Sequence, residues 1–259
     1  MSAPFWVVPC FALIAAAYAS VGLGGATAYA AVLSLTPVPY TQIPPLVLAL
    51  NLLVAGGSFV TFHRAGRVPY RMLLPLLAAS IPTAFAGGLV PIRERAFLIL
   101  LAAALFMAGV RFLLGPALVA WRSRRGRDLR SSAPGATSHP GRATLLGLGA
   151  IIGFLSGITG IGGGVYLGPV LLLLGACDME TVPAVTGGFV FFNSAAGLAG
   201  QLTRIHPVFD LWIPLGSAVI VGAFAGAFVT LRWLPIGRMQ RVFGCVLITA
   251  ALLNGAKAL

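Results

Sequence analysis

The sequence predicts an all-α polytopic membrane protein built from two inverted-topology repeats, with short or broken half-helices at glycine-rich motifs. Three observations predict this fold class. Hydrophobic residues make up 59% of the 259 residues, and the mean hydropathy is +0.99. Only 8% are charged, against about a quarter in a soluble domain. The two halves of the chain also resemble each other. So few charges cannot cover a water-facing surface, so most of the surface faces lipid and no soluble catalytic domain fits.

Ten apolar segments follow one another along the chain. A helix needs about 20 apolar residues to cross the hydrocarbon core. The first five segments lie near 6–22, 27–35, 44–62, 69–90 and 97–121, and the other five near 143–159, 164–176, 184–203, 209–232 and 237–257. Three units follow from this spacing: a first transmembrane repeat (1–121), a basic linker (122–142) and a second transmembrane repeat (143–259).

The linker 122–142 contains six arginines together with Ser, Gly and Pro, a composition that predicts a loop. The apolar stretch 5–17 resembles the core of a signal peptide, but no basic residue precedes it. We therefore expect this stretch to remain in the mature protein as the first helix.

Matching motifs recur in the same order in the two halves. Residues 22–25 (GLGG) match 160–163 (GIGG), and Asn51 matches Asn193. Three further pairs follow in order: 75–76 with 214–215, 85–87 with 224–226, and 109–111 with 255–257. Each match alone is at chance level in so apolar a chain. The constant order and the nearly constant spacing indicate an internal repeat.

Loop charge predicts the orientation, because cytoplasmic loops are enriched in Lys and Arg. If the linker is cytoplasmic, alternating crossings place twelve basic residues inside and four outside. Segment 44–62 then runs inward and its counterpart 184–203 runs outward. The halves are therefore expected to be inverted, as in many secondary transporters that bind their substrate between repeats near the midplane.

The glycine runs at 22–25 and 160–164 predict breaks in membrane helices, because glycine has little preference for the helical state. Irregular backbone at membrane depth is tolerated where it is buried or lines a watery cavity. A helix that starts at such a break presents unpaired N–H groups and the positive end of its dipole. Two such breaks predict an anion site that needs no charged side chain. The alternative is glycine for close helix packing.

Polar residues inside apolar segments are few, so each is a candidate donor to the anion. Amide and hydroxyl groups suit a sulfonate or similar oxyanion, while hydrogen bonding between helices is the alternative role. The expected substrate-binding residues are Gly24, Gly25, Asn51, Thr159, Gly162, Gly163, Gly164, Tyr166, Thr186, Asn193 and Ser194. The five acidic residues fall in loops or at segment ends, so we expect no carboxylate relay at the midplane.

The run SGITGIGGGVYLGPVLLLLG at 156–175, followed by AVTGG at 184–188, resembles the signature of the sulfite exporter TauE/SafE family. The resemblance covers essentially the whole chain. The first half departs from the pattern, with Ala26 in place of a third glycine and Ala31 in place of Pro169. The resemblance to this family implies a multi-pass transporter of small sulfur oxyanions and organosulfonates in the bacterial inner (plasma) membrane.

The expected partners are a small anionic substrate and the lipid bilayer, with no nucleic acid, no cofactor and no metal. The sequence leaves open whether the protein forms a homo-oligomer. No nucleophile, base and acid lie together at membrane depth, so no enzyme is expected. Alternative functions are carriage of another small anion, and uptake of a thiosulfate-like compound through a transient adduct on Cys10, Cys177 or Cys245.

Overall fold

The computed structural model describes residues 5–19, 24–129, 140–177, 181–205, 211–230 and 236–258. These residues form ten α-helices and no β-strand. The helices of the first half are α1 (Val7–Ala19), α2 (Ala26–Ser34), α3 (Ile43–Arg64), α4 (Tyr70–Leu89) and α5 (Glu94–Leu129). Those of the second half are α6 (Arg142–Thr159), α7 (Gly164–Leu173), α8 (Val182–Leu202), α9 (Trp212–Thr230) and α10 (Ile236–Ala258). The predicted all-α polytopic class is confirmed, and each helix coincides with one of the ten apolar segments.

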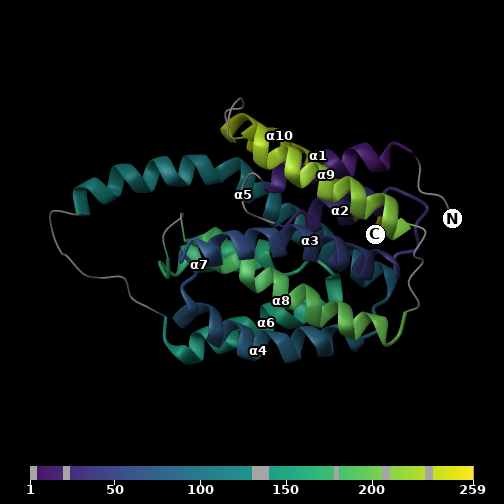
Figure 1. Ribbon diagram of the computed structural model, residues 1–259, viewed down its shortest axis with the longest axis horizontal. Helices are drawn as coiled ribbons and strands as arrows, with labels where there is room; N and C mark the ends of the chain where they lie inside the picture. Colours follow the sequence, from purple (N-terminus) through teal and green to yellow (C-terminus); the bar gives the residue numbers. More distant parts are fainter. Residues whose placement is uncertain are drawn as a thin grey trace.

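Four helices in the described part are long and apolar enough to cross a membrane, namely α3, α4, α6 and α8. Pro44 and Pro45 stand in the first turn of α3, and Pro183 stands in the first turn of α8. Proline suits this position because its missing N–H would have no partner there. In Figure 1, α4 and α6 lie along one edge of the bundle and α1 and α9 along the other, with α3 and α8 between them.

Several helix pairs have a counterpart when the two halves are exchanged. The α4–α6 pair corresponds to the α9–α1 pair, and α2–α3 corresponds to α7–α8. Helices α3 and α8 run antiparallel, because Asn51 meets Ser194 at one level and Gly187 lies against Phe59 at another. Inverted halves would give this arrangement, and the inverted relation itself stays a prediction.

Close packing of α4 on α6 depends on glycines spaced four residues apart, which lie on one helix face. A Cβ atom at any of them would collide with a carbonyl oxygen of α4. The distances would be 2.3 Å from Leu76 O at Gly149, 2.5 Å from Ser80 O at Gly153 and 2.0 Å from Ala84 O at Gly157. On α9, a Cβ at Gly222 would lie 2.1 Å from Ala12 O of α1. The packing role of glycine therefore accounts for these four positions.

We expect Gly153→Ala to lower the free energy of unfolding by about 1–3 kcal/mol, the usual range for overpacking. The new methyl group would push α6 away from the Ser80 carbonyl. Gly147→Ala is the matched control on the same helix, since no atom lies within 4 Å of the Cβ it would add. Thermal unfolding of the two variants in detergent tests this, and equal melting temperatures would contradict the packing role.

The prediction of a loop over 122–142 is wrong at the N-terminal end of this range. Helix α5 continues through the arginine-rich stretch to Leu129, and α6 begins at Arg142. Arginine is a good helix former, so charge alone does not end a helix that has already been nucleated. At 36 residues, α5 is about 54 Å long at 1.5 Å per residue, and Figure 1 shows it projecting beyond the other helices. Residues 130–139 lie outside the described part of the chain.

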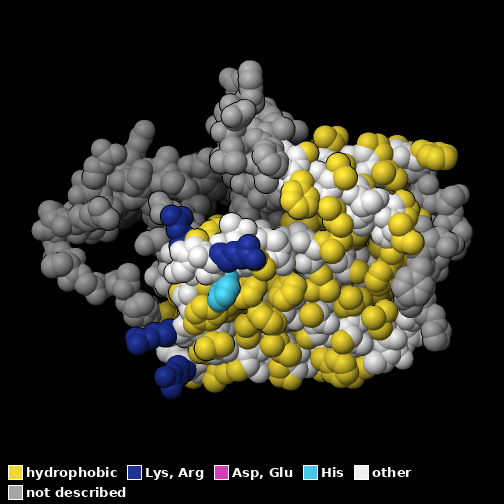
Figure 2. Space-filling model, viewed as in Figure 1, with side chains coloured by type: hydrophobic (Ala, Val, Ile, Leu, Met, Phe, Trp, Pro, Cys, Tyr) yellow, Lys and Arg dark blue, Asp and Glu magenta, His cyan; other side chains and the backbone are white. Residues whose placement is uncertain are grey.

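Arginines gather at the end of the molecule where α3 ends and where α4 and α6 begin. The Lys and Arg side chains visible in Figure 2 lie at this end, beside a face covered largely by hydrophobic side chains. The exposed arginines of this end are Arg64, Arg67, Arg71 and Arg142. These arginines are among the loop charges that predict the cytoplasmic side, and the orientation itself stays a prediction.

Candidate functional site

The second glycine run forms a break in the backbone, as predicted. Helix α6 ends at Thr159 and α7 begins at Gly164. Between them, Gly160, Gly162 and Gly163 have φ angles of 74°, 76° and 80°. This left-handed region is strained for residues with a side chain and free for glycine. The glycines therefore allow the chain to reverse within a few residues.

The first glycine run also separates two helices, since α1 ends at Ala19 and α2 begins at Ala26. Residues 20–23, including Gly22, lie outside the described part of the chain. Gly25 precedes α2 with a φ of −81°, so its backbone does not require glycine. Space requires it instead, because a Cβ at Gly25 would lie 2.7 Å from Tyr29 Cζ.

Asn51, near the middle of α3, lies between the two glycine breaks. A Cβ at Gly24 would lie 2.0 Å from Asn51 Oδ1, and a Cβ at Gly162 would lie 2.2 Å from Asn51 Nδ2. One amide group therefore fills the space left by both missing side chains. The two breaks were predicted to face one ligand, and the structure brings them together around this asparagine.

Ser194 of α8 completes the contact between the halves. Asn51 Nδ2 donates a hydrogen bond of 3.1 Å to Ser194 Oγ, and both residues are fully buried. Since this hydroxyl oxygen accepts from Asn51, its own hydrogen remains to be donated elsewhere. Asn51 Oδ1 has no hydrogen-bond partner.

Further polar atoms near the second break lack partners. Ser156 Oγ and both amide atoms of Asn193 are buried without a hydrogen bond. Ser156 lies beside the break, since a Cβ at Gly163 would lie 3.4 Å from Ser156 Cβ. A buried polar atom without a partner costs about 1–3 kcal/mol. Such a concentration of unsatisfied groups at the start of α7 is typical of a site whose partner is a ligand.

The remaining predicted residues fall into two groups. Thr159 and Tyr166 flank the second break, with their side chains within hydrogen-bonding reach of each other, and Gly164 lies against Val190. Thr186 is not brought to the break. It donates to the Val182 carbonyl of its own helix at 2.8 Å and lies two turns, about 12 Å, before Ser194 along α8.

Several residues of the site were not predicted from the sequence. Ser156 is the first residue of the glycine motif. Its position one helical turn before Gly160 is the only feature of the sequence that could have predicted it as a site residue. Pro44 lies against the break, since a Cβ at Gly160 would lie 2.4 Å from its Cα. Gln201 joins two helices instead, because Gln201 Nε2 donates to the Gly157 carbonyl of α6 at 3.0 Å.

The site is electrically neutral. The buried polar side chains in the described part of the chain are Thr27, Asn51, Ser80, Ser156, Thr159, Thr186, Asn193, Ser194, Gln201 and Asn254. None of these side chains carries a formal charge. No group of three His, Cys, Asp or Glu residues that could hold a metal ion occurs among the described residues. An anion here would be held by hydrogen-bond donors and the helix dipole of α7.

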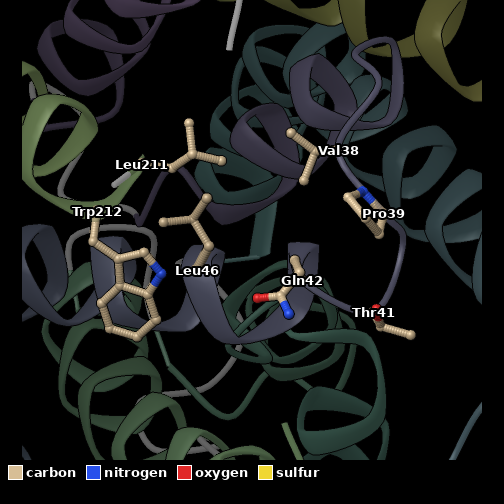
Figure 3. A pocket seen from close by; sticks show the side chains of 7 residues that line it. All are labelled: Val38, Pro39, Thr41, Gln42, Leu46, Leu211 and Trp212. Carbon is tan, nitrogen blue, oxygen red and sulfur yellow. The ribbon is translucent and has the colours of Figure 1, made fainter. Parts of the chain in front are cut away.

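A separate cavity of about 180 Å³ opens beside the first turn of α3. Figure 3 shows Leu211 and Trp212 on one side of it and Val38, Pro39 and Thr41 on the other, with Gln42, which precedes α3, and Leu46 of α3 between them. Leu46 precedes Asn51 by five residues, about 7.5 Å along the helix axis. The cavity thus lies toward the end of α3 opposite the exposed arginines.

Known proteins resemble this chain over nearly its whole length. A family model described as "Sulfite exporter TauE/SafE" matches residues 7–253. The "Probable membrane transporter protein y4hK" of Sinorhizobium fredii (strain NBRC 101917 / NGR234) is 33% identical over 248 residues, covering 93% of this chain and 94% of that protein. The "Probable membrane transporter protein MamO" of Paramagnetospirillum magneticum (strain ATCC 700264 / AMB-1) is 27% identical over 241 residues, covering 81% of this chain and 38% of that protein. No solved structure matches the chain.

Proposed function

Since this chain belongs to the sulfite exporter TauE/SafE family, we propose that it carries a small sulfur-containing anion, such as sulfite or an organosulfonate, across the bacterial plasma membrane. The observation that carries this proposal is the position of Asn51 between the two glycine breaks. The relatives are named as membrane transporters, and their names give no substrate. Family membership confirms that the chain is a membrane transporter and not an enzyme.

The anion would bind at the N-terminus of α7. The first N–H groups of a helix have no partner within the helix, and the dipole makes this end positive. Helix α7 begins at Gly164, beside the hydroxyl groups of Ser156 and Ser194. Both hydroxyls have a hydrogen that the oxygens of a sulfur anion would accept.

The site's depth supports transport rather than surface binding. Asn51 lies near the middle of α3 and Ser194 near the middle of α8, so the contact between them lies near the midpoint of both crossings. We propose that α3 and α8 are equivalent helices of two inverted halves, and their antiparallel contact supports this. Rocking of one half against the other would then open the site to each side in turn.

The arginine-rich end, with the linker 122–142, is proposed to face the cytoplasm. An interior-negative potential would then favour outward movement of the anion by about 2.3 kcal/mol per charge per 100 mV. It would oppose uptake by the same amount. The proposed direction is therefore export.

Flux into liposomes tests the proposed function. The purified protein is expected to give saturable flux of sulfite or an organosulfonate, and acetate serves as the carboxylate control. Gly163→Leu is expected to abolish this flux, because a Cβ at Gly163 would already lie 2.9 Å from Phe189 Cε1. Absence of saturable flux for every sulfur anion would contradict the proposal.

The thiol alternative predicts a different result for the cysteines. Cys10 and Cys177 are half-buried, Cys245 is exposed, and none of the three forms a disulfide bond. We expect the triple Cys→Ser variant to keep its flux within about twofold, since none of the three thiols belongs to the proposed site and the change in side-chain volume is small. A tenfold or greater loss, measured on protein of unchanged melting temperature, would favour a transient sulfur adduct instead.

A further inference from the structure

The polar atoms at the glycine breaks include acceptors that no protein donor satisfies. Asn51 Oδ1 and Asn193 Oδ1 are buried and unpartnered, and so is Asn193 Nδ2. An anion with only acceptor oxygens would satisfy the nitrogen and the nearby hydroxyls. Such an anion would give no hydrogen bond to the amide oxygens of Asn51 and Asn193, because it has no hydrogen to donate.

Asn193 lies on the face of α8 that covers the turn between α6 and α7. One turn earlier, Phe189 lies against Gly163, with Phe189 Cε1 at 2.9 Å from a Cβ placed there. One turn later, a Cβ at Gly197 would lie 3.3 Å from Gly157 Cα on α6. Residues four apart share a helix face, so Asn193 lies between these two contacts and faces the same turn.

The amide of asparagine offers two donors and one acceptor group, whereas serine hydroxyls offer one donor and accept as well. Asn51 already uses a donor on Ser194, which leaves its carbonyl oxygen as an acceptor beside Gly24. Asn193 keeps both functions available. The ligand that matches these groups has anionic oxygens and also an N–H or O–H of its own.

Resting on the proposed function, we propose that the site selects sulfur oxyanions that carry a hydrogen-bond donor, with Asn51 and Asn193 as the residues that determine this specificity. Singly protonated inorganic oxyanions belong to this class, as do sulfonates with an amino or hydroxyl group next to the sulfur. Fully ionised dianions and simple alkyl sulfonates do not.

Sulfamate and methanesulfonate test the proposal directly. Both carry one negative charge at neutral pH and have nearly the same shape, but sulfamate has an NH₂ group where methanesulfonate has CH₃. We expect the purified full-length protein to bind sulfamate at least about tenfold more tightly in calorimetry, equal to about 1.4 kcal/mol. Equal affinities would overturn the proposed specificity and leave the proposed function standing. If neither ligand binds and no sulfur anion is transported, the proposed function fails as well.

Variants assign the preference to the two asparagines. In Asn193→Leu, which removes the acceptor at similar volume, the ratio of the two affinities is expected to fall to about one, since the protein then loses the partner of the ligand N–H. Asn51→Leu is the second variant, for use if Asn193→Leu does not yield folded protein. Asn254→Leu is the matched control, because Asn254 is also fully buried with an unpartnered amide oxygen but lies on α10. A ratio that stays above tenfold in whichever of these two variants yields folded protein would overturn the assignment.

Discussion

Replacing Gly162 with alanine is expected to reduce anion flux by more than about 100-fold. The added Cβ would lie 2.2 Å from Asn51 Nδ2 and 2.9 Å from Ser194 Oγ. The backbone φ of 76° disfavours any side chain, at about 1–2 kcal/mol. The methyl group therefore occupies the space of the amide that joins the two halves. Tracer flux in liposomes, with size-exclusion chromatography to confirm folding, measures the effect.

Gly175→Ala separates the effect of backbone strain from the effect of displacing the Asn51 amide. Gly175 has a φ of 63°, so alanine meets a similar backbone strain there, but no atom lies within 4 Å of the Cβ it would add. We expect this variant to be slightly less stable and to transport at nearly the normal rate. Equal losses in the two variants would mean that strain, and not displacement of Asn51, stops transport.

Asn51→Leu is expected to lower flux at low substrate concentration about 10- to 100-fold. A hydrogen bond involving a charged group contributes about 1.5–3 kcal/mol, and this variant removes the amide that positions the Ser194 hydroxyl. Stability should respond differently from transport. Leucine removes the unpartnered Oδ1 from a fully buried position, so the melting temperature is expected to stay the same or rise.

Asn254→Leu is again the matched control. It makes the same change at another fully buried asparagine, whose Nδ2 donates only to the Ala250 carbonyl of its own helix. We expect its flux to stay within about twofold of the unsubstituted protein. If both asparagine variants lose flux equally, Asn51 has no special place in the transport path.

Much of the helical structure could be predicted from the sequence, because it depends on local composition. Every predicted segment overlaps one helix, and most helix ends agree within a few residues, such as 44–62 with Ile43–Arg64. The exception is α5, where the polarity of the sequence predicts a helix end at 121 although arginine supports helix formation. Polarity marks where a helix leaves lipid, which differs from where its hydrogen bonds stop.

The site could be predicted only in part. The sequence predicts both Gly162 and Asn51, one for its conformational freedom and the other as a rare polar residue in an apolar segment. It predicts Thr186 for the same reason as Asn51, but the Thr186 hydroxyl bonds to its own helix. The hydroxyl of a threonine within a helix can donate to the carbonyl four residues earlier, as that of Thr186 does, whereas the amide of Asn51 reaches a neighbouring helix. The sequence around the two residues does not show which of these bonds forms.

The amino-acid sequence is enough to predict a helical membrane transporter with two glycine-rich breaks. Hydropathy and glycine content act over a few residues, and the family signature lies in a continuous run. The meeting of both breaks at Asn51 appears only in the folded protein, because that contact joins residues of separate segments, with Asn51 and Ser194 lying 143 positions apart. Protein interiors are closely packed, so the space that a glycine leaves is filled by a group from another helix, and the sequence does not show which group this is.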